Sequence, residues 1–422
     1  MLNIIWTGFF FLAALSVLYQ ALFLQQATVL NEIMTTLFQT AKTAFDISLG
    51  LTGVMTLWLG IMRIGEAGGM VALLSRWLAP PFRVLFPELP RDHPAAGAMV
   101  MNIAANMLGL DNAATPLGLK AMRELQSLNT DPETASNAQI MFLVINTSSV
   151  TIIPTTIFTY LYQLGYPNPT ELFIPILLAT SCSSLAGLIA VSLYQRINLL
   201  TPRRLLFIGA VFTVISLLLT SLLTLDRETM QGLSLTASNG FIFGVIILFL
   251  LLAVHKKINV YEQFIEGAKE GFQVAIGIIP YLVAMLVAIG VFRASGAMDI
   301  VLSIIDAVVR AIAWSLDTMG LIHYQGAPLA FVDALPTGFM KPLSGSGSRG
   351  LMIETIQAHG VDSLVAKIVA VMQGSTETTF YIIAVYFGSV GIKKTRHAVP
   401  CGLIADAAGI TAAIAICYLF FG

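Results

Sequence analysis

The sequence predicts an all-α polytopic membrane protein, built from two inverted-topology repeats with re-entrant or broken helices and about nine transmembrane spans. Hydrophobic residues make up 57% of the 422 residues and charged residues 11%, whereas a soluble domain has roughly a quarter charged residues. The apolar runs are continuous rather than alternating, which excludes a β-barrel. The composition excludes soluble enzymes and disordered proteins, and the net charge of -1 implies no nucleic-acid partner. The predicted surroundings are a lipid bilayer.

Nine segments are apolar enough to cross a bilayer, which takes about twenty residues. They are 3–24, 45–62, 139–164, 171–195, 204–225, 238–254, 274–292, 364–390 and 398–421. Two further segments, 95–125 and 326–357, have polar, glycine- and proline-containing centres between short apolar arms. We expect these two to be re-entrant, because such short arms do not span the hydrocarbon layer.

Four segments are amphipathic, and the last of them, 297–316, is predicted to lie at the membrane interface. They are 32–46, 66–86, 258–272 and 297–316. In the last segment Asp306 and Arg310 are spaced four residues apart, so a helix would bring them together.

An internal repeat with a shift of 227 residues organises the chain. AKTAFDISLG at 41–50 matches AKEGFQVAIG at 268–277, and the same shift pairs Ser148 with Ser375 and Thr151 with Thr378. The order of predicted elements repeats as well. We therefore predict a first repeat at 1–200, a linker with an extra helix at 201–234 and a second repeat at 235–422. If the two broken segments are re-entrant, the extra helix inverts the second repeat relative to the first.

The distribution of positive charge favours this inverted topology. With re-entrant segments and a cytoplasmic N-terminus, the 22 Lys and Arg residues divide into fifteen on the cytoplasmic side and seven on the other. If both broken segments crossed the membrane, the split would be close to even and the repeats would be parallel. We therefore predict a cytoplasmic N-terminus and a C-terminus outside.

Polar residues gather in the two broken segments and in the spans predicted to face them, with Pro116 expected to end the first break. Inverted repeats with broken helices are typical of secondary transporters, whose sites lie near the bilayer midplane. Amides and hydroxyls suit a polar, mostly neutral solute or a partly dehydrated ion; the alternative is that they hold helices together. The candidate substrate-binding residues are Asn102, Asn106, Asp111, Asn112, Thr115, Asn146, Ser148, Ser149, Ser344, Ser346, Ser348, Gln373, Ser375, Thr376 and Glu377.

Two acids are predicted at membrane depth, where ionisable residues are costly and usually functional. Glu377 lies at the polar centre of its span, and Asp406 has small neighbours that would admit a close helix. Either is a candidate for coupling transport to a proton or Na⁺. The alternative is a structural ion pair with Arg349, Lys367 or Arg396.

The segment GSGSRG at 345–350 fits the G-x-G-x-x-G pattern, but no β-strand precedes it, so we reject a dinucleotide site. A glycine-rich break that opens a helix still leaves N–H groups that could face an anion or a carbonyl oxygen. The three cysteines lack paired spacing and the five histidines are scattered. We predict no metal site, no cofactor and no enzyme activity.

Three segments resemble a known family. MNIAANMLGLDNAATPLGLKAM at 101–122 resembles the signature of spore maturation protein A, while KPLSGSGSRGLMIE at 341–354 and MQGSTETTFYIIAVYFGSVGIKKTRHA at 372–398 resemble spore maturation protein B. The chain looks like a fusion of the two, with 204–225 as the joining helix. Both resemble the nucleoside-recognition, or Gate, family, which also occurs in concentrative nucleoside transporters and in a ferrous-iron transporter. The resemblance implies Gate-type repeats in a bacterial cytoplasmic (inner) membrane, but it does not supply a substrate.

Two functions remain open. The first is a transporter of a small polar solute, nucleoside-like or another metabolite, with a site between the repeats. The second is a non-transporting membrane scaffold, or a spore- or envelope-maturation factor, that retains the fold. They differ in whether the two polar breaks meet around a solvent-reachable cavity. Association into a homo-oligomer is also left open.

Overall fold

The computed structural model describes residues 2–23, 28–86, 88–90, 93–148, 150–197, 209, 213, 226–318 and 329–422. Over these ranges the chain is almost entirely helical and forms no β-strand. Seven of the described helical segments are long and apolar enough to cross a membrane. The predicted class, an all-α polytopic membrane protein, is therefore confirmed.

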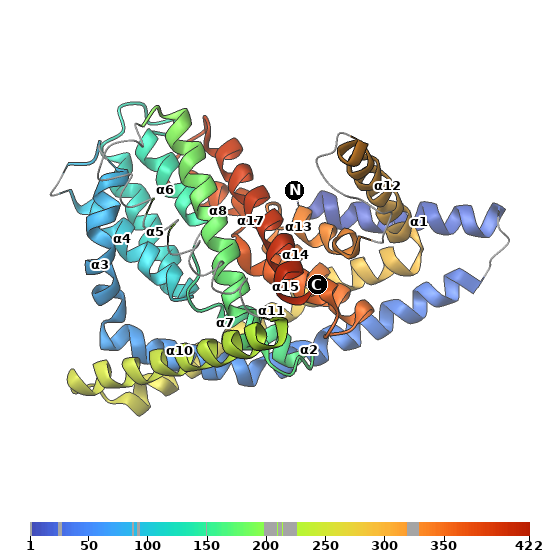
Figure 1. The fold of residues 1–422 in the computed structure, drawn as a ribbon, viewed down its shortest axis with the longest axis horizontal. Helices are drawn as coiled ribbons and strands as arrows, with labels where there is room; N and C mark the ends of the chain where they lie inside the picture. Colours follow the sequence, from blue (N-terminus) through green and yellow to red (C-terminus); the bar gives the residue numbers. More distant parts are fainter. Residues whose placement is uncertain are drawn as a thin grey trace.

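The helices fall into two series along the chain (Figure 1). The first series comprises α1 (Leu2–Phe23), α2 (Thr28–Gly68), α3 (Met70–Leu85), α4 (Pro94–Met107), α5 (Asp111–Gln126), α6 (Asn137–Ser148), α7 (Thr155–Gln163), η1 (Pro169–Leu172) and α8 (Phe173–Tyr194). The second comprises α10 (Arg227–His255), α11 (Val260–Ala294), α12 (Ala297–Thr318), η2 (Ala330–Ala334), α13 (Leu335–Met340), α14 (Gly345–His359), α15 (Leu364–Ser375), α16 (Thr379–Gly388) and α17 (Ala398–Phe421).

The order of elements in the second series repeats that of the first. The 227-residue shift found in the sequence carries α6 onto the bounds of α15, and brings α1, α2, α3 and α8 close to α10, α11, α12 and α17. The packing repeats too, because α1 packs on α11 as α10 packs on α2. The orientation of the two series across a membrane and the boundaries 1–200, 201–234 and 235–422 stay predictions. The predicted joining helix at 204–225 lies outside the described residues, apart from 209 and 213.

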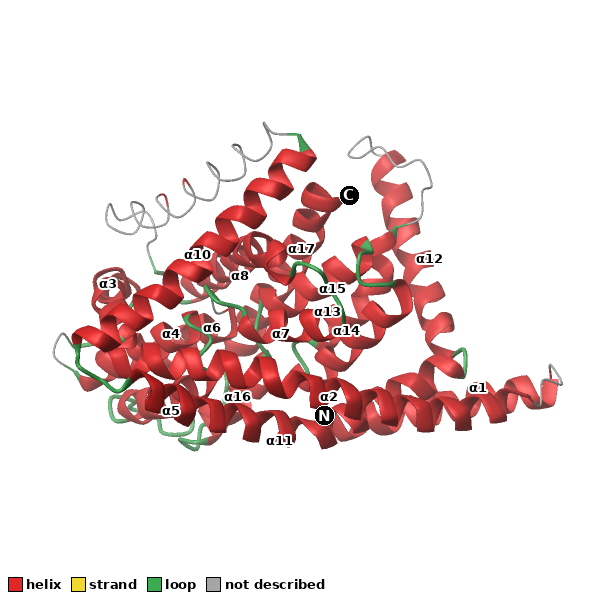
Figure 2. Cartoon of the chain, turned by 90° about the horizontal axis from the view of Figure 1, so that it is seen from below, coloured by secondary structure: helices red, strands yellow, loops and turns green. Residues whose placement is uncertain are grey.

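Two long helices form one side of the molecule. Helices α2 and α11 run alongside each other, with 41 and 35 residues respectively (Figures 1 and 2). Glycines permit this close approach: a Cβ on Gly267 would lie 2.3 Å from the carbonyl oxygen of Leu59, and one on Gly271 would lie 2.7 Å from that of Met55. Small residues four apart are a common way for membrane helices to pack backbone against backbone. The predicted amphipathic segments 32–46 and 258–272 are parts of these two helices.

The other two amphipathic segments fold as separate helices, α3 and α12. Both lie next in sequence to a long helix, α3 after α2 and α12 after α11. Arg310 Nε lies 2.5 Å from Asp306 Oδ2 on α12, which confirms the predicted pair.

The predicted spans with polar centres are broken helices. Helix α6 ends at Ser148 and α7 begins at Thr155, while α15 ends at Ser375 and α16 begins at Thr379. In the first break the β-branched residues Val150 to Ile153 have lower helix propensity, and Pro154 disfavours helical backbone in the residue before it. The segment predicted as span 139–164 therefore comprises two short helices and is absent from the seven candidate spans.

The predicted re-entrant segments fold as helical hairpins, α4–α5 and α13–α14. The first hairpin turns at Leu108–Leu110, where Gly109 has φ +70° and a Cβ would lie 2.7 Å from the carbonyl oxygen of Ile153. Only glycine fits such a left-handed, crowded turn. The expectation that Pro116 ends the break is wrong, because Pro116 lies inside α5. With 14 and 16 residues, α4 and α5 are shorter than the roughly twenty residues of a full span.

Candidate functional site

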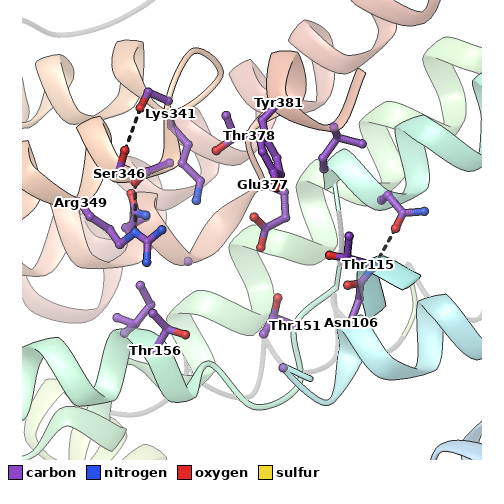
Figure 3. Close-up of a pocket in the computed structure, with 18 of the residues that line it drawn as sticks. Asn106, Thr115, Thr151, Thr156, Lys341, Ser346, Arg349, Glu377, Thr378 and Tyr381 are labelled. Atoms are coloured by element: carbon purple, nitrogen blue, oxygen red, sulfur yellow. Dashed lines mark hydrogen bonds between the residues drawn. The ribbon is translucent and has the colours of Figure 1, made fainter. Parts of the chain in front are cut away.

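The two breaks and the two hairpin turns line one cavity of about 900 Å³. Figure 3 shows Lys341, Ser346 and Arg349 on one side, Asn106, Thr115 and Thr151 on the other, and Glu377 between them. Both series of helices supply its walls, so the cavity lies at the interface of the two repeats. The two segments predicted to be broken, 95–125 and 326–357, now seen as hairpins, both line this space.

Part of the predicted substrate-binding set lines the cavity. These residues come from both hairpins and both broken helices: Asn106, Thr115, Asn146, Ser344, Ser346, Gln373 and Glu377. Their shared feature is a position at or within one helical turn of a chain break. Helix ends leave backbone groups unpaired and place polar side chains beside them.

The other predicted residues are placed differently. Ser149 lies outside the described residues, and the structure describes no side chain for Asp111 or Asn112 at the start of α5. The remaining ones are buried behind the cavity wall: Asn102, Ser148, Ser348, Ser375, Thr376 and Asp406. They make hydrogen bonds within and between helices, which is the alternative role considered for them.

Asn146 and Gln373 are equivalent residues of the two repeats, 227 positions apart, and both amides line the cavity. Asn106 Nδ2 on the first hairpin donates to Asn146 Oδ1 at 2.7 Å. On the second hairpin Ser348 Oγ is placed to donate to Gln373 Oε1, at 2.7 Å. Each hairpin is therefore tied to the broken helix of its own repeat through an amide at the cavity wall.

A second network joins the repeats behind the first amide. Asn102 Nδ2 donates to the Ala114 carbonyl oxygen at 2.7 Å and to the Tyr386 hydroxyl at 3.2 Å. The Tyr386 hydroxyl in turn donates to Asn146 Oδ1 at 3.2 Å. Tyr386 lies on α16 and the others on or beside the first hairpin and α6, so the network fixes α16 against the first repeat.

The two breaks also touch through their backbones. Glu377 N donates to the Thr147 carbonyl oxygen at 2.7 Å, and Thr376 Oγ1 lies 3.0 Å from the same oxygen. The carboxylate of Asp406 on α17 accepts from the hydroxyls of Thr376 and Thr379, the latter at 2.6 Å. Asp406 is 1% exposed and holds the second break in shape from behind.

Three charged side chains line the described part of the cavity: Lys341, Arg349 and Glu377. Glu377 is exposed to the cavity and forms no ion pair with any described residue. The predicted alternative, an ion pair of Glu377 with Arg349, is therefore not present. Arg349 Nε donates to the Gly345 carbonyl oxygen at 3.2 Å, which holds the guanidinium beside the first turn of α14.

Sequence reasoning missed several residues of the cavity wall. From the sequence, Lys341 and Arg349 have roles only as topology charges or as partners of an acid. The aromatic residues Tyr281, Tyr381 and Tyr386 have no predicted role, although they line the cavity. Arg349 is the fifth residue of α14 just as Thr115 is the fifth of α5, but this correspondence needs the helix bounds, because the 227-residue shift pairs Thr115 with Pro342. Aromatic residues inside apolar runs carry no local signal either.

No cluster of three or more His, Cys, Asp or Glu side chains suited to a metal ion occurs in the described parts of the chain. The cavity wall offers amides, hydroxyls, one carboxylate and two cations. These groups bind and orient a polar molecule by hydrogen bonds and charge.

Comparison with known proteins identifies the family. The model of the Gate family, described as nucleoside recognition, matches residues 48–162. Spore maturation protein B of Bacillus subtilis (strain 168) is 41% identical over 195 residues, which cover 46% of this chain and 98% of that protein. Spore maturation protein A of the same organism is 40% identical over 189 residues, covering 45% of this chain and 93% of that protein. No solved structure matches the chain significantly.

Each relative is matched over almost its whole length by somewhat less than half of this chain. The chain therefore belongs to the spore maturation protein A and B family of Gate-domain membrane proteins, with similarity to both members in one polypeptide.

Proposed function

We propose that the protein transports a small polar solute through the site between its two repeats. The observation that carries the proposal is the cavity itself, because breaks in helices of both repeats face one polar space. Broken helices at a repeat interface supply unpaired backbone groups where a solute can replace its water shell. The proposal includes no catalytic step and no cofactor.

The size and lining of the cavity suit a metabolite rather than a bare ion. A volume of about 900 Å³ lies within the range of small-molecule sites, roughly 300–1,000 Å³. Polar groups from both repeats would have to move relative to each other for the solute to be released on either side. We place the protein in the bacterial cytoplasmic membrane with a cytoplasmic N-terminus, following the charge distribution.

The second candidate is a non-transporting membrane factor. It is favoured by the names of the relatives, which describe spore maturation and no solute. In this interpretation the hydrogen bonds between the two breaks keep the core rigid, and no solute passes through the cavity. The two candidates predict different consequences of filling the cavity.

The test fills the cavity and leaves the rest of the surface unchanged. Thr151→Trp places a large side chain in the cavity wall, and Leu15→Trp places the same side chain on an exposed position of α1 as a matched control. Untargeted metabolite profiles are compared between deletion cells and cells carrying wild type or either variant. The solute found in this way is then tested for uptake into proteoliposomes.

We expect Thr151→Trp to give the profile of the deletion and Leu15→Trp to give that of wild type. Both variants should show wild-type thermal unfolding in detergent. If stable Thr151→Trp protein restores the wild-type profile, the cavity carries no solute and the scaffold is the better function.

A further inference from the structure

We propose that the solute is an organic anion, whose carboxylate or phosphate group binds against Lys341, Arg349 and the first turn of α14. This inference rests on the proposed transport function and names its substrate class. It differs from the sequence-based expectation of a mostly neutral solute. Four observations carry it.

The first observation is the position of the positive charges. Lys341 at the end of α13 and Arg349 on α14 both line the cavity, and Figure 3 places them on the same side as Ser346. Lys341 is 4% exposed. A cation enclosed in this way is held away from bulk water, so an anion in the cavity interacts with it more strongly than at a surface.

The second observation is the start of α14. Ser344 caps the helix by accepting from Gly347 N at 3.0 Å, which leaves the N–H groups of Gly345 and Ser346 as the donors of the first turn. Both residues line the cavity, and neither N–H has a partner among the described residues. Free N–H groups at a helix N-terminus bind carboxylate or phosphate oxygens well.

The third observation is a difference between the two hairpins. Helix α5 begins with an acid of its own, Asp111, whereas α14 begins Gly-Ser-Gly and has no acid in its first turn. The first turn of α14 therefore supplies no carboxylate of its own. Arg349 adds a planar guanidinium one turn further on, a group that matches carboxylate and phosphate geometry.

The fourth observation is the distance between opposite charges. Glu377 lies between the cationic side and the neutral side in Figure 3, and it forms no ion pair within 4.0 Å with a described residue. The chain thus does not neutralise Arg349 with Glu377. A solute with an anionic group at one end and hydrogen-bond donors at the other would pair with both Arg349 and Glu377.

The test measures the sign of the electrostatic potential at each side of the cavity. Ser346→Cys and Thr151→Cys place single thiols on the cationic side and on the neutral side respectively. The background carries Cys182→Ala, since Cys182 is partly exposed whereas Cys401 and Cys417 are buried. The full chain in nanodiscs reacts with two methanethiosulfonates of similar size, one with a sulfonate group and one with a trimethylammonium group, each rate being normalised to that of a free thiol.

We expect the normalised rate at Ser346→Cys to favour the anionic reagent by about fivefold at low ionic strength, and the preference to fall in high salt. Arg349→Gln should reduce this preference by about threefold, while Arg349→Lys should retain it. The preference at Thr151→Cys should be weaker. A cationic preference at Ser346→Cys, or no change with Arg349→Gln, overturns the inference while leaving transport intact.

Access and charge preference separate the two proposals. If neither reagent reaches either cysteine, the cavity is closed to water and the transport function itself fails. Protection of Ser346→Cys by glutamate would identify a carboxylate site, and protection by a nucleoside 5′-monophosphate a phosphate site. Protection by the uncharged nucleoside that equals or exceeds protection by its monophosphate contradicts an anion site.

Discussion

The break between α6 and α7 and the break between α15 and α16 occupy equivalent places in the two repeats but differ in chemistry. Asn146 and Thr151 in the first break correspond to Gln373 and Thr378 in the second, and all four line the cavity. Between them, Val150 in the first break corresponds to Glu377 in the second. The polar scaffold is thus repeated, whereas the charge is confined to one copy.

The same asymmetry extends to the supporting helices. Thr115 and Arg349 are the fifth residues of α5 and α14, and Ala179 on α8 corresponds to Asp406 on α17. A shared hydrogen-bonding frame with charges on one side can hold a solute in one orientation. We therefore expect changes of charge in the second repeat, at Arg349 or Glu377, to alter function without altering stability, and changes to the hydrogen-bonding frame of the first hairpin to alter mainly stability.

The largest expected effect concerns orientation, because the comparison assumes that the two repeats are inverted. Reporter fusions after Arg196 and after Lys394 should both report the cytoplasm, and a fusion after Asp226 should report the outside. The excess of Lys and Arg on one side is the physical reason. Opposite reports from the fusions at Arg196 and Lys394 would show that the repeats are parallel.

The next effect concerns Glu377, whose equivalent in the first break, Val150, is uncharged. Glu377→Gln should fold normally, because the side chain faces the cavity and no ion pair with a described residue is broken. Ion-coupled accumulation of the solute should fall about tenfold or more, whereas passive exchange should survive. Both are measured in proteoliposomes with the solute found in the metabolite comparison. Carboxylates at membrane depth are suited to load and release a cation during the cycle.

Two outcomes would contradict this role of Glu377. Loss of about 3–5 kcal/mol of stability would indicate a broken buried ion pair instead. A stable variant with wild-type accumulation would leave Asp406 as the remaining candidate for coupling. Glu377→Asp serves as the control that keeps the charge.

Sequence reasoning was most successful where the physical signal is local. Continuous apolar runs predict nine spans, of which seven coincide with the candidate spans of the described residues. The segments 139–164 and 364–390 are predicted as spans with polar centres, and the structure breaks the helix at both centres, where the residues weaken it. The end of the first break is predicted at Pro116, whereas the helix resumes at Asp111, directly after the turn at Gly109, which carries the positive φ that a tight turn needs. Proline was over-weighted because an interior position in α5 is unusual for it.

The composition of the cavity wall was harder to predict, since it depends on contacts between distant segments. Asn102 and Asn106 lie four residues apart on the same face of α4, but only Asn106, one turn nearer the end of the helix, lines the cavity. Asp406 is conspicuous in the sequence and is nevertheless buried behind the wall. Arg349 is inconspicuous, because in one sequence a cation at a cavity resembles a cation at a membrane edge.

A third effect, on stability, concerns Asp406, which supports the second break. Asp406→Ala removes the acceptor for the hydroxyls of Thr376 and Thr379 and leaves both buried. We expect the free energy of unfolding to fall by about 1–3 kcal/mol, the cost of one unsatisfied buried group, because Thr376 can still donate to the Thr147 carbonyl oxygen whereas Thr379 loses its acceptor. Asp406→Asn keeps one acceptor oxygen and should fall by less. Thermal unfolding in detergent measures the stability of both variants. An alanine variant as stable as wild type would show that the second break needs no acid behind it, like the first break, which has Ala179 at the equivalent place.

The smallest effect is expected at the first hairpin, where the comparison predicts a structural role. A Cβ on Gly118 of α5 would lie 2.1 Å from the Tyr386 hydroxyl oxygen, so Gly118→Ala must displace the ring from its network with Asn102 and Asn146. Overpacking of this kind costs about 1–3 kcal/mol, from which the helix gains back about 0.5–1 kcal/mol. Gly97→Ala on α4 is the matched control, since nothing lies within 4 Å of its Cβ.

Unfolding experiments on a double variant connect the Gly118 effect to Tyr386. In a Tyr386→Leu background both the hydroxyl and the ring edge are gone, so Gly118→Ala should change the free energy of unfolding as little as Gly97→Ala does. If Gly118→Ala is as destabilising without the tyrosine as with it, the clash lies elsewhere and the network does not fix α16 against the first repeat. If the coupling is found and transport is unchanged in the stable variants, the first repeat is a frame for the charged chemistry of the second.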